Sequence, residues 1–140
     1  MTGRRIGAAL GVAALLVAAA ASLTAVAGGA ETSRTVTITI RHSRFHPARV
    51  EVSPDSTVRF EVVNHDPIDH ELIVGDPGVQ LHHEAGTDRH HDGTHGAVSV
   101  PAGGRGFTEP AFGARGRVLL GCHLPGHWDY GMRGVVRIED

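Results

Sequence analysis

The chain lacks lysine, has a single cysteine and contains no run of clustered basic residues. Because Cys122 is the only cysteine, an internal disulfide is excluded. The basic residues other than histidine are all arginine, a composition to which we attach no mechanism, and their scattered placement argues against a nucleic-acid partner. No internal repeat is present, and no segment after residue 34 shows a clear helical period.

The first 27 residues have the features of an export signal. Arg4 and Arg5 precede an apolar stretch that ends in the small residues Ala25, Val26 and Ala27. We predict that residues 1–27 are cleaved, or remain as a membrane anchor because the stretch is just long enough to span a bilayer. Either outcome places the rest outside the cytoplasm: secreted, periplasmic or on the outer face of the cell membrane.

After a linker over residues 28–34, residues 35–140 have the length of one domain with one modest core. Residues 35–40 alternate strictly between polar and apolar side chains, which is typical of a strand with one buried face. Further short β-branched or aliphatic runs bounded by turn residues are expected at 49–52, 57–63, 70–74, 97–100, 106–109, 117–122 and 134–138. This rhythm predicts an all-β fold, a β-sandwich or barrel.

Near the end of the chain, Cys122, His127 and Met132 follow one another with four residues between each. A thiolate, an imidazole and a thioether in one short loop match a blue-copper centre, whose trigonal site has a second histidine. His70 is the best source, because it leads an apolar run that is typical of a strand. His65 is its main rival. An unpaired cysteine in an exported protein is exposed to oxidation unless something protects it. Metal binding would protect Cys122, and the alternative interpretation is that Cys122 is a buried, inert residue.

These two motifs together resemble the single-domain cupredoxins, the type 1 blue copper proteins, and the Cys-x4-His-x4-Met loop is closest to the rusticyanin-like members. The resemblance covers about residues 35–140. It implies a Greek-key sandwich and one type 1 copper per chain, with His70, Cys122, His127 and Met132 as ligands. It also places Asn64 where the family has an asparagine that ties the two ligand loops together.

The function implied by the resemblance is one-electron transfer between redox partners, such as an oxidase, a reductase or a cytochrome, with no substrate transformed. His127 is then the electron port at the surface. Candidates for an apolar docking rim are Pro47, Leu124, Pro125 and Trp128. Trp128 and Tyr130 alternatively pack in the core. We expect a monomer that contacts a membrane only through the N-terminal anchor, if that is retained.

A second metal site is an open alternative. Residues 76–96 are long for a structureless loop, so we expect them to be functional or mobile, or to contain a short helix around residues 80–85. The candidate ligands in this loop are His82, His83, His90, His91 and His95. The competing interpretation is a solvated loop with incidental metal affinity.

His123 directly follows Cys122, so in a strand it points to the opposite face and cannot bind the same ion. Copper nitrite reductases use such a histidine to connect blue copper with a second, catalytic copper. Two rival functions therefore accompany electron transfer: a copper-binding or delivery module with the histidine-rich loop as acquisition site, and a small copper enzyme. The short single domain argues against the enzyme and favours a structural or surface His123.

Overall fold

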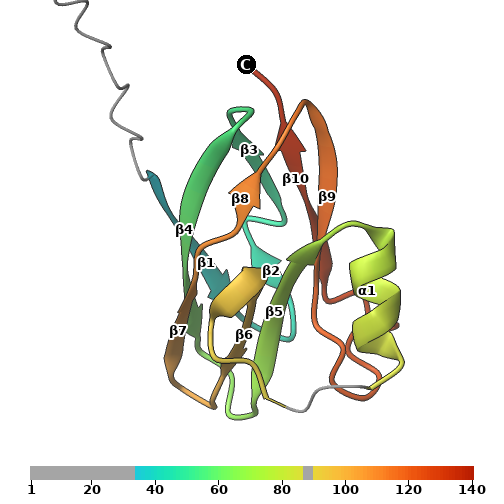
Figure 1. Ribbon diagram of the computed structural model, residues 1–140. Coiled ribbons are helices and arrows are strands. Elements are labelled where there is room, and N and C mark those ends of the chain that lie inside the picture. Colours follow the sequence, from blue (N-terminus) through green and yellow to red (C-terminus); the bar gives the residue numbers. More distant parts are fainter. Residues whose placement is uncertain (1–33, 87–89) are drawn as a thin grey trace, which may run out of the picture.

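The computed structural model describes residues 34–86 and 90–140, and strands make up most of this part (Figure 1). The predicted export signal, residues 1–27, and all of the predicted linker except Arg34 lie outside the described residues. Within the described part, no helix is both long and apolar enough to cross a bilayer.

One sheet is built around the longest strand, β4 (Ser56–Asn64). On one side β4 pairs in parallel with β1 (Arg34–Ile40), which pairs with the short β2 (Phe45–His46). On the other side β4 pairs antiparallel with β7 (Arg105–Thr108) and β8 (Ala111–Phe112). Every second residue of β4 is buried, as expected for a strand with one face on the core.

The second sheet carries the strand ends that matter for the site. Its order is β3 (Arg49–Val52), β10 (Arg133–Ile138), β9 (Gly116–Gly121), β5 (His70–Gly75) and β6 (Ala97–Val100). β3 and β10 are parallel, whereas the other pairs are antiparallel. β5 is buried on both faces through most of its length, because the core covers one face and other parts of the chain cover the other.

The two sheets lie face to face and enclose a single apolar core (Figure 1). Phe60 and Phe112 meet edge to face in this core, with ring centres 6.3 Å apart. Strands that neighbour each other in a sheet are mostly not consecutive in the chain, so the chain crosses repeatedly between sheets. The predicted all-β sandwich is confirmed.

The predicted strands are confirmed to within a residue or two at each end. The short strands β2 and β8 were missed, because a pair of residues carries no readable alternation. The helix expected in the long loop is α1 (Pro77–Glu84). Its start is determined by Asp76, whose side chain accepts a hydrogen bond from the Val79 N–H at 2.9 Å, and by Pro77 in the first turn.

Helix α1 lies on the outer face of the second sheet, against β5 and β9 (Figure 1). Gln80 attaches it there, because its buried amide donates to the carbonyl oxygens of Ile73, Gly75 and Leu119 at 3.2–3.4 Å. The long loop then continues through a short 3-10 turn, η1 (Thr94–Gly96), into β6. The helix thus covers the face of the sheet opposite to the core.

Candidate metal centre

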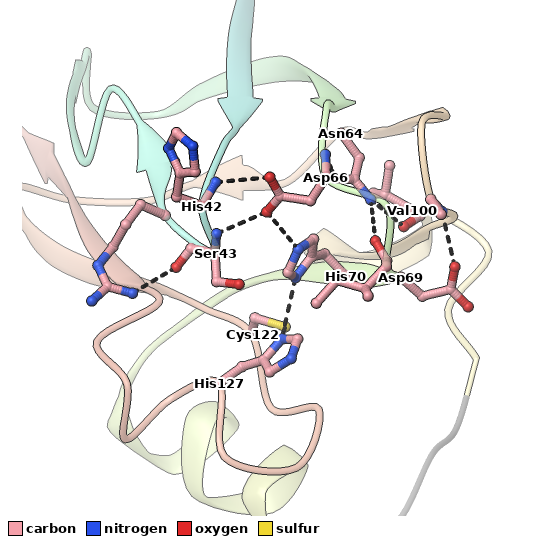
Figure 2. Close-up of polar contacts among 12 residues, drawn as sticks. His42, Ser43, Asn64, Asp66, Asp69, His70, Val100, Cys122 and His127 are labelled. Atoms are coloured by element: carbon pink, nitrogen blue, oxygen red, sulfur yellow. Dashed lines mark hydrogen bonds and ion pairs between the residues drawn. The ribbon is translucent and has the colours of Figure 1, made fainter.

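Three potential metal ligands converge at one end of the sandwich. His70 is the first residue of β5, Cys122 directly follows β9, and His127 lies in the loop that joins β9 to β10. His70 Nδ1 is 3.2 Å from His127 Nδ1, and Cys122 Sγ is 3.2 Å from the same nitrogen (Figure 2). Among the described residues, this is the one group of three such side chains whose ligand atoms all lie within 4.8 Å of one another.

The loop over residues 122–132 is shaped by its own backbone hydrogen bonds. The Met132 N–H donates to the His127 carbonyl at 3.0 Å, and the Cys122 N–H donates to the Met132 carbonyl at 3.2 Å. Gly126 and Gly131 adopt positive φ values of 81° and 87°, which a residue with a Cβ rarely tolerates. The loop therefore holds Cys122, His127 and Met132 together, and Met132 is fully buried in the core beside Cys122.

Asp66 orients the ring of His70. Its Oδ2 lies 3.0 Å from His70 Nε2 and accepts from the Ser43 N–H at 2.8 Å, while Oδ1 accepts from the His42 N–H at 2.7 Å (Figure 2). Burial raises the pKa of Asp66, but the two backbone hydrogen bonds and the contact with His70 outweigh it and lower that pKa below its usual value. The ionised carboxylate thus orients Nδ1 of His70 toward Cys122 and His127.

Burial keeps the thiol of Cys122 protonated in the absence of a metal ion. Burial raises its pKa to about 12, against the backbone N–H groups of Leu124 and Glu71, which favour the thiolate. The pKa of His127 is lowered, mainly by burial and then by His70, so its imidazole is neutral near pH 7. Two imidazole ligands and a sulfur that ionises on metal binding fit a soft, borderline ion such as copper.

The role predicted for Asn64 is wrong in one respect. Its amide nitrogen donates to the carbonyl oxygens of Ile68 and Pro101 at 2.8 and 3.0 Å, and its Oδ1 accepts from the Asp66 N–H at 2.9 Å. It therefore ties the loop before His70 to the turn after β6, and not to the loop of Cys122.

Glu71 makes the connection between the two ligand segments. Its backbone N–H interacts with the sulfur of Cys122, and its Oε1 accepts from the His123 N–H at 2.6 Å. The sequence interpretation missed both Glu71 and Asp66. The available signal was their position, since Glu71 follows His70 and Asp66 precedes it by four residues.

The remaining candidate residues are more dispersed. His65, the rival first ligand, is exposed. His123 faces away from the centre, as expected: its ring stacks on the half-buried Trp128, with ring centres 4.9 Å apart. Arg133 lies over the Trp128 ring, 5.6 Å from its centre, and Trp128 is not part of the buried apolar core. Tyr130 is 74% exposed, which excludes the core placement considered for it.

The histidine-rich loop divides in the structure. The rings of His83 and His91 lie 4.8 Å apart between centres, and those of His82 and His83 lie 5.8 Å apart. His90 instead lines a pocket beside His70, and His95 is an exposed residue of η1. The five histidines therefore do not form one cluster.

Comparisons with known proteins agree with this geometry. A family model described as a cupredoxin-like domain matches residues 8–90, more than half of the chain. The chain belongs to the cupredoxin-like family. This cupredoxin is 34% identical over 114 residues to the copper-resistant cuproprotein CopI of Rubrivivax gelatinosus, a match that covers 79% of this chain and 69% of the relative. It is 32% identical over 88 residues to CopI of Vibrio cholerae, covering 59% and 51% of the two chains.

Solved structures show the same fold. Auracyanin B matches with a TM-score of 0.64 and 19% identity over 76% of this cupredoxin and 89% of the other chain. The dithionite-reduced auracyanin of Roseiflexus castenholzii matches with a TM-score of 0.63 and 19% identity, covering 77% and 98%. Auracyanin A of Chloroflexus aurantiacus, a blue copper protein, has a TM-score of 0.56 and 19% identity, covering 75% and 98%. At this identity the likeness concerns the fold.

Proposed function

We propose that this cupredoxin is an exported type 1 copper protein that carries one electron at a time between redox partners. The proposed ligands are His70, Cys122, His127 and Met132. The observation that supports it is the convergence of two imidazole Nδ1 atoms and one buried sulfur within 4.8 Å. The fourth ligand is inferred from the Cys-x4-His-x4-Met spacing and from the burial of Met132.

A copper ion in this centre supplies a one-electron couple between Cu(II) and Cu(I). The residues of the chain keep the donor atoms in place during that change. His70 is held by a strand and by Asp66, whereas Cys122, His127 and Met132 are held by the hydrogen bonds of their loop. Because Cys122 and Met132 are fully buried, water is kept away from both sulfur atoms.

Electrons are proposed to enter and leave through His127. Its side chain is partly exposed, whereas His70 is buried. The neighbouring Pro125 is exposed and Leu124 is partly buried, and with the exposed Pro47 they are candidates for an apolar rim that a redox partner contacts. No substrate is transformed in this function, so the protein is proposed not to be an enzyme.

A copper titration of the purified protein tests the proposal. One equivalent of Cu(II) should give an intense blue or green colour and an EPR signal with narrow copper hyperfine splitting, followed by reversible voltammetry. Cys122→Ser should lose the colour, while His65→Gln, which changes an exposed histidine nearby, should keep it. Full colour in Cys122→Ser, or none in the wild type, contradicts the proposal.

Copper handling is a second candidate function. It is favoured by the match to CopI, which is named a copper-resistant cuproprotein. In that function the protein binds copper for protection or delivery to an oxidase, and its redox cycling need not be fast. Slow or irreversible voltammetry together with several exchangeable copper ions per chain supports handling. Nitrite- or oxygen-dependent turnover supports the third candidate, a small copper enzyme.

The location and assembly of the protein belong to the same proposal. The signal-like residues 1–27 support an extracytoplasmic protein, which is where an exported redox carrier meets its partners. We propose that it acts as a monomer. Fractionation of the native host and sedimentation of the purified domain test these two points.

A further inference from the structure

A second cluster of metal-binding side chains lies on the opposite face of the sheet. β5 and β9 are neighbours: β5 begins with His70 and Glu71, and β9 is followed directly by Cys122 and His123. Consecutive residues of extended chain point to opposite faces. His70 and Cys122 therefore point toward the proposed copper centre, while Glu71 and His123 point outward, beneath helix α1.

His91 is the unusual member of this cluster. Its side chain is 7% exposed, and its Nε2 is the one buried side-chain nitrogen or oxygen without a hydrogen-bond partner among the described residues. The closest partner of opposite charge is Glu71 Oε2 at 3.5 Å, which is too long for a good hydrogen bond. A buried polar atom without a partner destabilises a fold unless something binds it.

The position of His91 is firmly held. Its N–H donates to Ser99 Oγ, and its carbonyl accepts from the Ser99 N–H, both at 2.9 Å. Ser99 is directly opposite Glu71 in the pairing of β6 with β5. Glu71 is fixed in turn by the hydrogen bond from the His123 N–H, and its side chain is only 5% exposed. An imidazole and a carboxylate are thus held facing each other on a rigid sheet.

His83 of helix α1 completes the arrangement. Its ring centre is 4.8 Å from that of His91, close to the 4.9 Å between the rings of His70 and His127 in the proposed copper centre. A pocket of about 480 Å³ opens to solvent here, and Glu71, His83 and His123 are among the residues that line it. His123 itself is held by Glu84 at 2.6 Å and Gln80 at 2.7 Å.

We propose that Glu71, His83 and His91 form a second metal site, for a divalent transition-metal ion such as Cu(II) or Zn(II). Two imidazoles and one carboxylate, without sulfur, are a donor set for these ions, and Cu(II) binds most strongly in the general order of affinities. The donor atoms do not all lie within 4.8 Å of one another, so binding draws the His83 ring toward His91 and Glu71. Glu84, half exposed beside His123, lines the same pocket.

The site differs from the proposed copper centre in chemistry and in access. It contains no thiolate, so it binds without an intense charge-transfer colour, and it opens to solvent through a pocket. The two sites are joined by the peptide bonds of His70 with Glu71 and of Cys122 with His123. The proposal does not depend on electron transfer at the first site.

A zinc titration of the copper-loaded protein tests the second site. After one equivalent of copper has bound and loose metal has been removed with a mild chelator, Zn²⁺ is added in a calorimeter. We expect one further equivalent in the wild type. His83→Gln and His91→Gln each remove a proposed ligand. Each should weaken zinc binding by more than the roughly 10- to 100-fold that is typical when a hydrogen-bond partner of a metal ligand is replaced. His95→Gln, which changes an exposed histidine of the same loop, should leave it unchanged.

Cu(II) used in place of Zn²⁺ should add a second EPR signal with wide hyperfine splitting and coupling to nitrogen, absent in both variants. Circular dichroism checks that each variant is folded, and His83→Gln provides the test if the more buried His91→Gln unfolds. If the chain binds no blue copper, apo protein is titrated instead, and the variants should lose one equivalent of Zn²⁺. The proposal is overturned if no zinc binds, if the variants bind as the wild type does, or if His95→Gln removes the binding.

Discussion

Replacement of Asp66 by asparagine tests how the proposed copper centre is held. The carboxylate accepts three hydrogen bonds, from the N–H groups of His42 and Ser43 and from His70 Nε2. The amide of Asp66→Asn has one acceptor oxygen and an NH2 group, so its NH2 must face at least one of these donors. Loss of a buried hydrogen bond to a charged group costs about 1–3 kcal/mol.

The effect on the metal follows from the same contacts. Without the carboxylate, the His70 ring is oriented less firmly. We expect copper affinity to fall by roughly 10- to 100-fold, as is typical when a residue that hydrogen-bonds to a metal ligand is replaced. The lost negative charge stabilised Cu(II) more than Cu(I), so the reduction potential should rise. If the whole affinity loss falls on Cu(II), the rise is about 60–120 mV, at about 59 mV for each factor of ten.

The assay combines a chelator competition for Cu(II) with protein-film voltammetry. The matched control is Asp69→Asn, which removes the same charge from the same loop. Asp69 is exposed and accepts only from the Ala102 N–H, at 2.9 Å, among the contacts described. It should leave affinity and potential nearly unchanged. Equal effects of the two variants, or a lower potential in Asp66→Asn, would refute the role assigned to Asp66.

Three further predictions follow from burial and charge. In the folded, metal-free protein, the Cys122 thiol should react with iodoacetamide far more slowly than in the protein unfolded in urea, and equal rates would contradict its burial. The free energy of unfolding should also fall as pH rises from 9.0 toward about 12, because the thiol ionises at lower pH in the unfolded chain than in the folded one. Phe60→Ala should destabilise the fold by about 3–5 kcal/mol in urea denaturation, since Phe60 is fully buried against Phe112, whereas Phe107→Ala, which changes a more exposed ring, should cost clearly less. Zn²⁺ bound at the second site should raise the potential of the copper centre, because a nearby cation favours Cu(I); the shift should be absent in His91→Gln, and its persistence there would place the zinc elsewhere.

Much of the fold was predictable because the strands are local features. Alternation of polar and apolar residues identified β1, a β-branched and aliphatic run bounded by turn residues identified β4, and the apolar run beginning at His70 identified β5. The same reasoning did not find β2 or β8, which exist only because a neighbouring strand offers them hydrogen bonds. Helix α1 was expected only as an option, since its stability comes from Gln80 and its contacts with the sheet.

The sequence by itself determined the donor set of the candidate centre. Cys122, His127 and Met132 share one short loop, and the backbone hydrogen bonds and glycines that shape this loop are local, so their spacing carries the information. His70 was predictable because it begins a strand whose apolar pattern is plain.

Only the tertiary structure decided what surrounds these ligands. The register of β5 against β9 and β6 brings Glu71 beside His123 and His91, and the position of the turn at His42 and Ser43 gives Asp66 its donors. These contacts join residues far apart in the chain. They depend on how the two sheets and helix α1 pack, which no local pattern of residues records.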